Sequence, residues 1–282
     1  MTVLLAATAS PASSSTPTAG QLALLVVCIA LFAAGGVASM LRLWRDRPGL
    51  RIAARLCMSA GLSAAVAVLV WHSAGRGSWV PLSDNFDALI CLAVLLALFV
   101  VYVQGARGIP AMDWFVMPVV LLLLLAAGHF GTAEHHHYAR STWTWVHLAS
   151  SYAGAAAFAL AAAGGAMYIL ASRRLQRKAP AGLFRTSLER LERLTMSSVT
   201  LGFALLTIGL ITGGWILFAD HKHTAPAKVV LSVLAWLVYA VVLHAPINPR
   251  FRGRRAAALS VFGFLLMVGT LIAVQLLPGG NS

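Results

Sequence analysis

Charged residues are scarce in this chain, and acidic residues are the scarcest. Only 10% of the 282 residues carry charge, and Asp and Glu together number 8. A soluble domain has roughly a quarter of its residues charged. So few charges cannot cover a water-exposed surface, and 60% of the residues are hydrophobic. The deficit excludes a soluble fold for most of the chain and predicts that lipid is its solvent.

Alternation of apolar and polar residues is also missing, which excludes a transmembrane β-barrel. The apolar residues form continuous runs of helix length instead. The sequence therefore predicts an all-α, polytopic bundle of about eight transmembrane helices. The predicted spans lie near residues 20–42, 53–73, 86–104, 112–129, 143–171, 197–218, 227–245 and 256–277.

Cysteine is rare, and the N-terminus lacks charge. Cys28, Cys57 and Cys91 form no Cys-x-x-Cys pair, so thiol–disulfide chemistry and thiolate metal sites are not expected. Residues 1–19 are rich in Ser, Thr, Ala and Pro and lack the basic start of a signal peptide. We expect 1–19 to be a mobile outer tail and 20–282 to be a single transmembrane domain.

The net charge of +13 would suit a nucleic-acid binder, but its distribution indicates a membrane topology. Seventeen of the 21 Lys and Arg lie in alternate connections between the predicted spans. The other side holds only Arg76, Arg140, Lys222 and Lys228. Basic loops face the cytoplasm. We therefore expect both termini outside, basic loops inside, membrane lipid as the partner of the spans, and no nucleic acid.

One inner connection allows two interpretations. Phe184, Leu188, Leu191 and Thr195 recur at helical spacing among charged residues. This pattern is typical of a short amphipathic helix on the membrane surface. A continuation of the sixth span explains it equally well.

Histidines are the residues most informative about chemistry, because imidazole ligates haem iron, Zn, Cu and Ni. With the expected topology, eight of the nine lie at outer span ends or in outer loops. His135, His136 and His137 form a run that suits either a solvated loop or a metal site. The outer histidines are His72, His129, His135, His136, His137, His147, His221 and His223.

Among the histidines that fall within predicted spans, two are the main ligand candidates. His147 enters the fifth span and shares a helix face with Ser151 and Gly154. His244 ends a four-residue repeat that begins at Lys228 and includes Trp236. Polar residues within a span face the bundle interior or a cavity. Either histidine could serve as a ligand, or could pack between helices and bond to backbone.

Outer tryptophans and outer carboxylates carry less information. The tryptophans suit an aromatic belt at the membrane boundary, and a flat shelf for a porphyrin would use the same residues. They are Trp71, Trp79, Trp143, Trp145 and Trp215. The outer acidic residues are few and scattered, so we assign no general acid, general base or nucleophile.

Four segments in order resemble the cytochrome c assembly proteins, the CcsA/HemX-like group of haem-handling membrane proteins. They are 81–89 (PLSDNFDAL), 145–153 (WVHLASSYA), 206–215 (LTIGLITGGW), and the spacing from Lys228 through Trp236 and Tyr239 to His244, which is followed by 252–255 (RGRR) and 263–264 (GF).

The resemblance implies a haem-binding protein of cytochrome c biogenesis in the bacterial inner membrane. It implies haem b as cofactor, with His147 as an outer ligand and His244 as a ligand near the cytoplasmic side. Trp215, Trp236 and Lys228 would line the site. It also implies apocytochrome c and a second cytochrome-assembly subunit as partners, with haem presented or exported to the outer face.

Two departures from the family pattern leave alternatives open. The family's tryptophan-rich outer loop is replaced by residues 220–227 (DHKHTAPA), and its second outer histidine near the chain end is missing. His72, His221 or His223 would have to substitute for that histidine. These departures favour a divergent branch nearer the HemX-like members. The alternatives are an assembly factor without haem ligation and a metal or solute transporter that uses the outer histidines.

Overall fold

The computed structural model describes residues 17–44, 48–75, 85–105, 112–130, 142–177, 187–219, 226–244 and 253–276. Within these ranges the chain is entirely helical outside short turns. The helices are α1 (Ala19–Trp44), α2 (Pro48–Gly75), α3 (Asn85–Gly105), α4 (Met112–Phe130), α5 (Thr142–Gln176), α6 (Leu188–Ala219), α7 (Pro226–Leu243) and α8 (Arg254–Leu276). Each predicted span coincides with one helix, so the all-α fold class is confirmed.

Helix length and composition support a membrane protein. Among the described residues, α1, α2, α4, α5 and α6 are each long and apolar enough to cross a membrane. Shorter apolar segments, Phe86–Tyr102 and Val229–Leu243, lie in α3 and α7. Large apolar side chains such as Val26, Leu122 and Phe218 are exposed on the bundle surface. Lipid contact accounts for that exposure.

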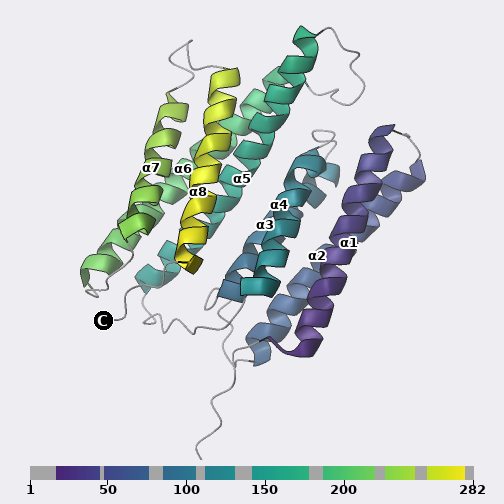
Figure 1. Cartoon of the computed structure of the whole chain (residues 1–282), viewed down its shortest axis with the longest axis horizontal. Helices are drawn as coiled ribbons and strands as arrows, with labels where there is room; N and C mark the ends of the chain where they lie inside the picture. Colours follow the sequence, from purple (N-terminus) through teal and green to yellow (C-terminus); the bar gives the residue numbers. More distant parts are fainter. Residues whose placement is uncertain are drawn as a thin grey trace, which may run out of the picture.

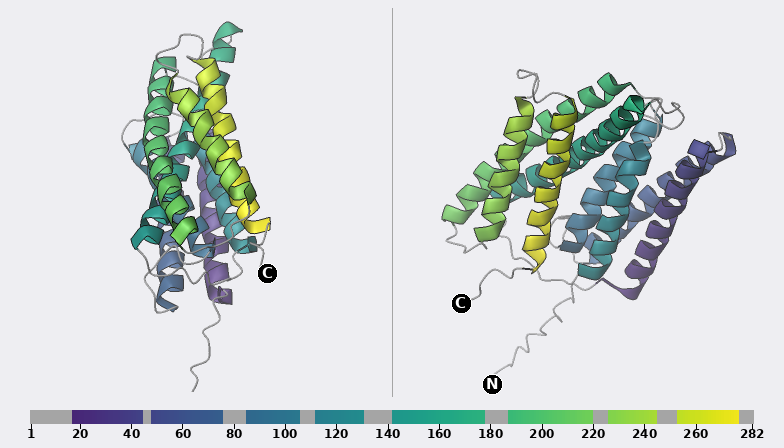
Figure 2. Two further views of the ribbon diagram at one scale, coloured as in Figure 1. Left: turned by 90° about the vertical axis from the view of Figure 1, so that its left-hand side faces the viewer. Right: turned by 45° about the horizontal axis from the view of Figure 1, so that its top comes forward.

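Helix α5 is the centre of the arrangement. It packs most extensively against α6 and also contacts α3, α4 and α8. Helices α1–α4 lie on one side of it and α6–α8 on the other (Figure 1). The right-hand view of Figure 2 shows the same order of helices. Successive helices run in opposite directions, so α1 begins and α8 finishes at the same end. We name this end the terminal end.

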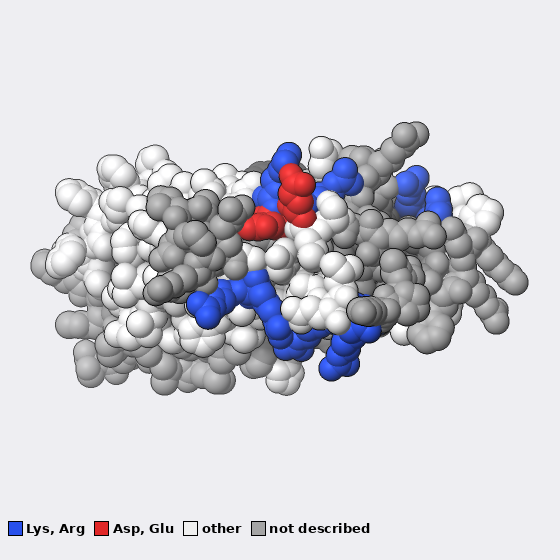
Figure 3. All heavy atoms as spheres, turned by 90° about the horizontal axis from the view of Figure 1, so that it is seen from above, with Lys and Arg blue, Asp and Glu red and all other residues white. Residues whose placement is uncertain are grey.

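The opposite end, which we name the arginine end, gathers positive charge (Figure 3). Every Lys or Arg side chain that the structure describes lies there, at the ends of α2, α5, α6 and α8. They are Arg51, Arg55, Arg173, Arg174, Arg177, Arg190, Arg193, Arg254 and Arg255. The charge segregation along the sequence thus corresponds to one end of the bundle.

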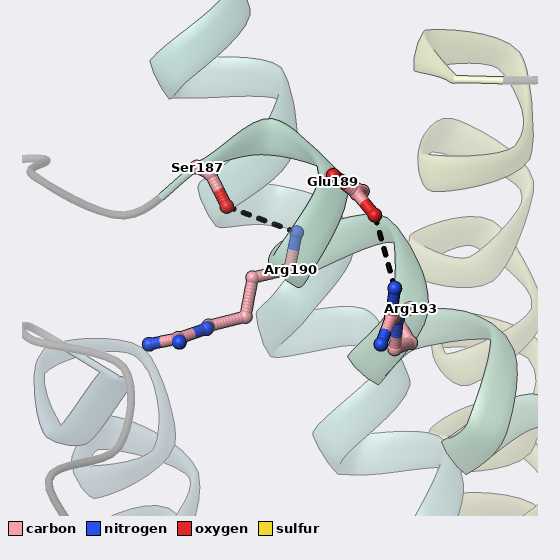
Figure 4. Close-up of polar contacts among 4 residues, drawn as sticks. All are labelled: Ser187, Glu189, Arg190 and Arg193. Carbon is pink, nitrogen blue, oxygen red and sulfur yellow. Dashed lines mark hydrogen bonds and ion pairs between the residues drawn. The ribbon is translucent and has the colours of Figure 1, made fainter.

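Helix α6 begins at this end with a polar cap. The backbone N–H of Arg190 donates to Ser187 Oγ at 3.3 Å, which satisfies one donor of the first turn. Arg193 donates to Glu189 one turn earlier at 2.9 Å (Figure 4). The helix then runs without interruption to Ala219. The residues from Leu188 onward therefore form the start of the sixth span and not a separate surface helix, while Phe184 lies outside the described residues.

Small residues bring α5 and α6 close together. A Cβ added at Gly202 would lie 2.8 Å from the Phe158 ring, and one at Gly164 would lie 2.7 Å from Thr195 Oγ1. Such spacing leaves no room for a methyl group. Small residues at helix crossings allow this close approach, which drives helix association in lipid.

Helices α5 and α8 meet in the same way. A Cβ added at Gly165 would lie 2.7 Å from the backbone oxygen of Ala257. Gly253, at φ +65°, precedes α8 and lies beside the Tyr168 hydroxyl. A residue with a Cβ would be strained at this φ. Glycine therefore sets both the turn into α8 and its distance from α5.

Among α1–α4, helix α1 packs against α4 through a buried polar contact. The hydroxyl of Ser39 donates to the carboxylate of Asp113. Both side chains are almost fully buried. Polar groups in hydrocarbon need partners within the protein, and this contact joins two helices that are not adjacent in the sequence.

Gly165→Ala is expected to destabilise the protein by about 1–3 kcal/mol, because the new methyl group overlaps backbone of α8. Gly269→Ala on α8 is the matched control, since no atom lies within 4 Å of its added Cβ. Thermal unfolding in detergent measures both. Equal midpoints for the two variants would contradict the close α5–α8 contact.

Candidate functional site

His147 lies near the start of α5, at the terminal end, with its ring against α6. Its Nδ1 is 2.8 Å from the backbone oxygen of Gly209. A carbonyl oxygen can only accept, so Nδ1 carries the proton in the neutral ring. Nε2 is then the nitrogen with a lone pair. The side chain is half-buried. This is the arrangement in which a histidine serves as a ligand through one nitrogen while a carbonyl orients the other.

Gly213 provides the surface on which the His147 ring rests. A Cβ at this position would lie 2.7 Å from His147 Cε1 and 3.0 Å from Nδ1. One turn earlier, a Cβ at Gly209 would lie 2.9 Å from Ser151 Oγ. At Gly214, which follows Gly213 in the sequence, an added Cβ would have no atom within 4 Å. The imidazole therefore reaches the α6 backbone because Gly213 has no side chain.

Two tryptophans flank this histidine. Trp143 lies one turn before His147 on α5, and Trp215 lies just beyond Gly213 on α6. Their ring centroids are 6.2 Å apart at 42°. They are 52% and 60% exposed. The sequence pattern assigns both to the aromatic belt or a porphyrin shelf, and the family resemblance adds Trp215 alone as a site residue. The four-residue spacing from Trp143 to His147 was the signal for its position.

Trp236, also predicted, is engaged in packing. Its Nε1–H donates to Thr207 Oγ1 at 3.0 Å. Its ring stacks on Phe203 with centroids 5.3 Å apart. Both contacts join α7 to α6. Lys228 lies in the first turn of α7, at the terminal end, and its side chain is outside the described residues.

His244 lies just past the last residue of α7, at the arginine end. Its Nδ1 is 2.8 Å from the backbone oxygen of Ala240, one turn back in its own helix. The side chain is exposed. Helix α7 has 18 residues and is about 27 Å long at 1.5 Å per residue. The structure therefore places His147 and His244 at opposite ends of the bundle.

His72 is buried at the terminal end, in the last turn of α2, and is 3% exposed. Its Nδ1 lies 3.2 Å from Gln21 Oε1 of α1. That oxygen also accepts the N–H of Thr18 at 2.9 Å, which fixes it as the amide oxygen. Thr18 Oγ1 accepts the Gln21 N–H in return, completing a capping box. His72 belongs to this α1–α2 contact, and its ring also meets Phe86 of α3.

The loop histidines that suggested a metal site lie outside the described residues. These are His135, His136, His137, His221 and His223. Within the described ranges, no three His, Cys, Asp or Glu side chains gather closely enough to hold a metal ion. His147 with its two tryptophans is therefore the best candidate site in that part of the chain.

Gln21→Leu is expected to destabilise the protein by about 1–3 kcal/mol, because it removes the acceptor of a buried imidazole N–H and half of the capping box. Thr200→Val is the control, since Thr200 is exposed and bonds only to Met196 within its own helix. Thermal unfolding in detergent compares the two. A stable Gln21→Leu variant would mean that the His72 contact contributes nothing.

Gly213→Ala is expected to displace the His147 ring and break its bond to Gly209, while Gly214→Ala leaves both in place. The change in the first variant follows from the 2.7 Å approach to Cε1. The ¹⁵N NMR shifts of His147 report the Nδ1–H tautomer. Identical His147 spectra in the two variants would contradict this placement.

Comparison with known proteins identifies the family. The family described as Cytochrome C assembly protein matches residues 53–280. The cytochrome c biogenesis protein CcsA of Prochlorococcus marinus (strain NATL2A) is 35% identical over 99 residues, which cover 34% of this chain and 31% of the relative. CcsA of Thermosynechococcus vestitus is 36% identical over 99 residues, covering 34% and 30%. CcsA of Nostoc punctiforme is 37% identical over 94 residues, covering 33% and 27%.

The matched part thus spans about a third of the length of these relatives. The family match, by contrast, runs from within α2 to beyond the last described residue of α8. It includes His147, Gly209, Gly213 and Trp215, and leaves α1 outside. This chain belongs to the cytochrome c assembly protein family.

Proposed function

We propose that this protein binds haem b and presents or exports it for attachment to apocytochrome c at the outer face of the bacterial inner membrane. Membership of the cytochrome c assembly family supports a role in cytochrome c biogenesis. The observation that carries the haem proposal is the bond between His147 Nδ1 and the Gly209 carbonyl. It leaves Nε2 as the ligating nitrogen of a half-buried imidazole.

The residues around His147 suit haem as cargo. Haem supplies an iron that imidazole ligates and a flat apolar macrocycle with two carboxylates. Trp143 and Trp215 offer exposed aromatic surface on both helices beside the histidine. Lys228, at the same end in the first turn of α7, is our candidate for pairing with a carboxylate.

His244 is the proposed second ligand, at the other end of the bundle. Its Nδ1 is held by the Ala240 carbonyl, as that of His147 is held by Gly209, so Nε2 is again the available nitrogen. Trp236 lies on α7 between Lys228 and His244. Two ligands at opposite ends fit a protein that accepts haem on one side and presents it on the other.

The proposed sidedness follows from the arginines. Basic residues mark cytoplasmic loops, so the arginine end would face the cytoplasm and the terminal end the outside. His147 would then lie on the side where apocytochrome c receives haem. A second cytochrome-assembly subunit is the other proposed partner, with lipid around the spans.

A specific observation favours one alternative, a membrane assembly factor without haem ligation. Trp236, expected to line the haem site, and His72, one of three histidines that could substitute for the missing outer one, are engaged in helix packing through Thr207 and Gln21. Those contacts serve a structural role without any cofactor. His147 decides between the two functions, because its Nδ1 bond to the Gly209 carbonyl leaves Nε2 for a ligand.

Visible spectroscopy of the purified protein tests the proposal. We expect a Soret band, and at least about a tenfold loss of haem affinity in His147→Ala, a magnitude typical of weakened metal-site ligation. His244→Ala tests the second ligand separately. His129→Ala is the control, because His129 is an exposed histidine at the same end of the bundle.

The outcomes separate the functions. No Soret band on the protein after haem is supplied and unbound haem is removed, or equal bands in His147→Ala and His129→Ala, would contradict haem ligation and favour the assembly factor. Loss of the band in His147→Ala alone would restrict ligation to the terminal end.

A further inference from the structure

The Gly209 carbonyl that orients His147 has a second side-chain donor. Thr212 Oγ1 lies 2.7 Å from the Ile208 oxygen and 3.2 Å from the Gly209 oxygen. Thr212 is 4% exposed. Its single hydroxyl proton is therefore shared between two carbonyls of its own helix. The longer and weaker of the two hydrogen bonds is the one to the Gly209 oxygen, which also accepts from His147.

We propose that Thr212 is a positioning residue that limits the strength of the His147–Gly209 hydrogen bond and thereby sets how strongly Nε2 donates to a bound iron. The part concerning iron rests on the proposed function. An imidazole that donates Nδ1–H to a strong acceptor gains electron density at Nε2. A second donor on the same oxygen draws on its lone pairs and makes it a weaker acceptor.

The position of Thr212 distinguishes it from the other threonines of α6. Thr200 makes the same bond one turn back, to Met196 at 2.9 Å, but it is exposed and lies far along the helix from His147. Thr207 bonds to Phe203 and accepts the Trp236 N–H. Thr212 alone among these three lies next to Gly213 and shares an acceptor with His147.

The geometry around the shared oxygen is rigid. Gly213 holds the ring against α6, with Cε1 2.7 Å from where a Cβ would lie. Ser151 occupies the neighbouring space at Gly209, 2.9 Å from an added Cβ. These contacts hold the imidazole beside the Gly209 carbonyl, so we expect a change in the Thr212 bond to act on the His147–Gly209 bond. Axial imidazole strength is one of the protein's means of setting a haem potential.

The test replaces the hydroxyl while keeping the shape of the side chain. In Thr212→Val without haem, we expect the His147 Nδ1–H proton signal to shift downfield, because the bond to Gly209 strengthens. In the same variant loaded with haem, we expect a lower midpoint potential and a higher Fe–imidazole stretching frequency in the ferrous state. Thr200→Val should match the parent protein in all three measurements.

Thr212→Ser keeps the hydroxyl and loses only a methyl group, so it should behave like the parent protein. If Thr212→Ser shifts as far as Thr212→Val, packing is responsible and the proposal is overturned. Unchanged His147 signals in Thr212→Val overturn it as well. Should the protein bind no haem, the proposed function fails, while the haem-free spectra still decide whether Thr212 controls the hydrogen bond.

Discussion

Hydrocarbon offers no hydrogen-bonding partners, so each polar group in this bundle must find one in the protein. Threonines and serines bond back to carbonyls of their own helices, as Thr200, Thr207 and Ser260 do. Polar groups that bond across helices are fewer and fix the packing. The His147 imidazole meets the same requirement, because its Nδ1–H donates to the Gly209 carbonyl of the neighbouring helix.

Close helix approach is the second requirement, and glycine meets it. The crossings of α5 with α6 and with α8 bring side chains of one helix onto the backbone of the next. At most of these crossings the contact is packing alone, as where Phe158 meets Gly202. At Gly209 and Gly213 the same close approach puts a carbonyl within reach of an imidazole. The candidate site therefore depends on the same close helix packing that stabilises the rest of the bundle.

The helices could be predicted from the sequence because each is encoded by its own run of apolar residues. The opposite placement of His147 and His244 followed from the expected topology, which puts the first at an outer span end and the second near the cytoplasmic side. Contacts between side chains of different helices could not be predicted from the sequence, because they depend on the register between the helices. Neither the Gly209 carbonyl under His147, nor Gln21 beside His72, nor the pairing of Trp143 with Trp215 leaves a periodic signal in one segment. The start of α6 at Leu188 was undecided for a related reason, since the same apolar stripe suits a membrane surface or a neighbouring helix.

The capping box at Thr18 and Gln21 bears on the order in which the bundle is assembled. A chain is synthesised from its N-terminus, so α1 is available before His72 of α2 is made. The amide oxygen that receives the imidazole N–H is already fixed by Thr18 within α1. When α2 is made, His72 therefore meets an acceptor that α1 already holds in place.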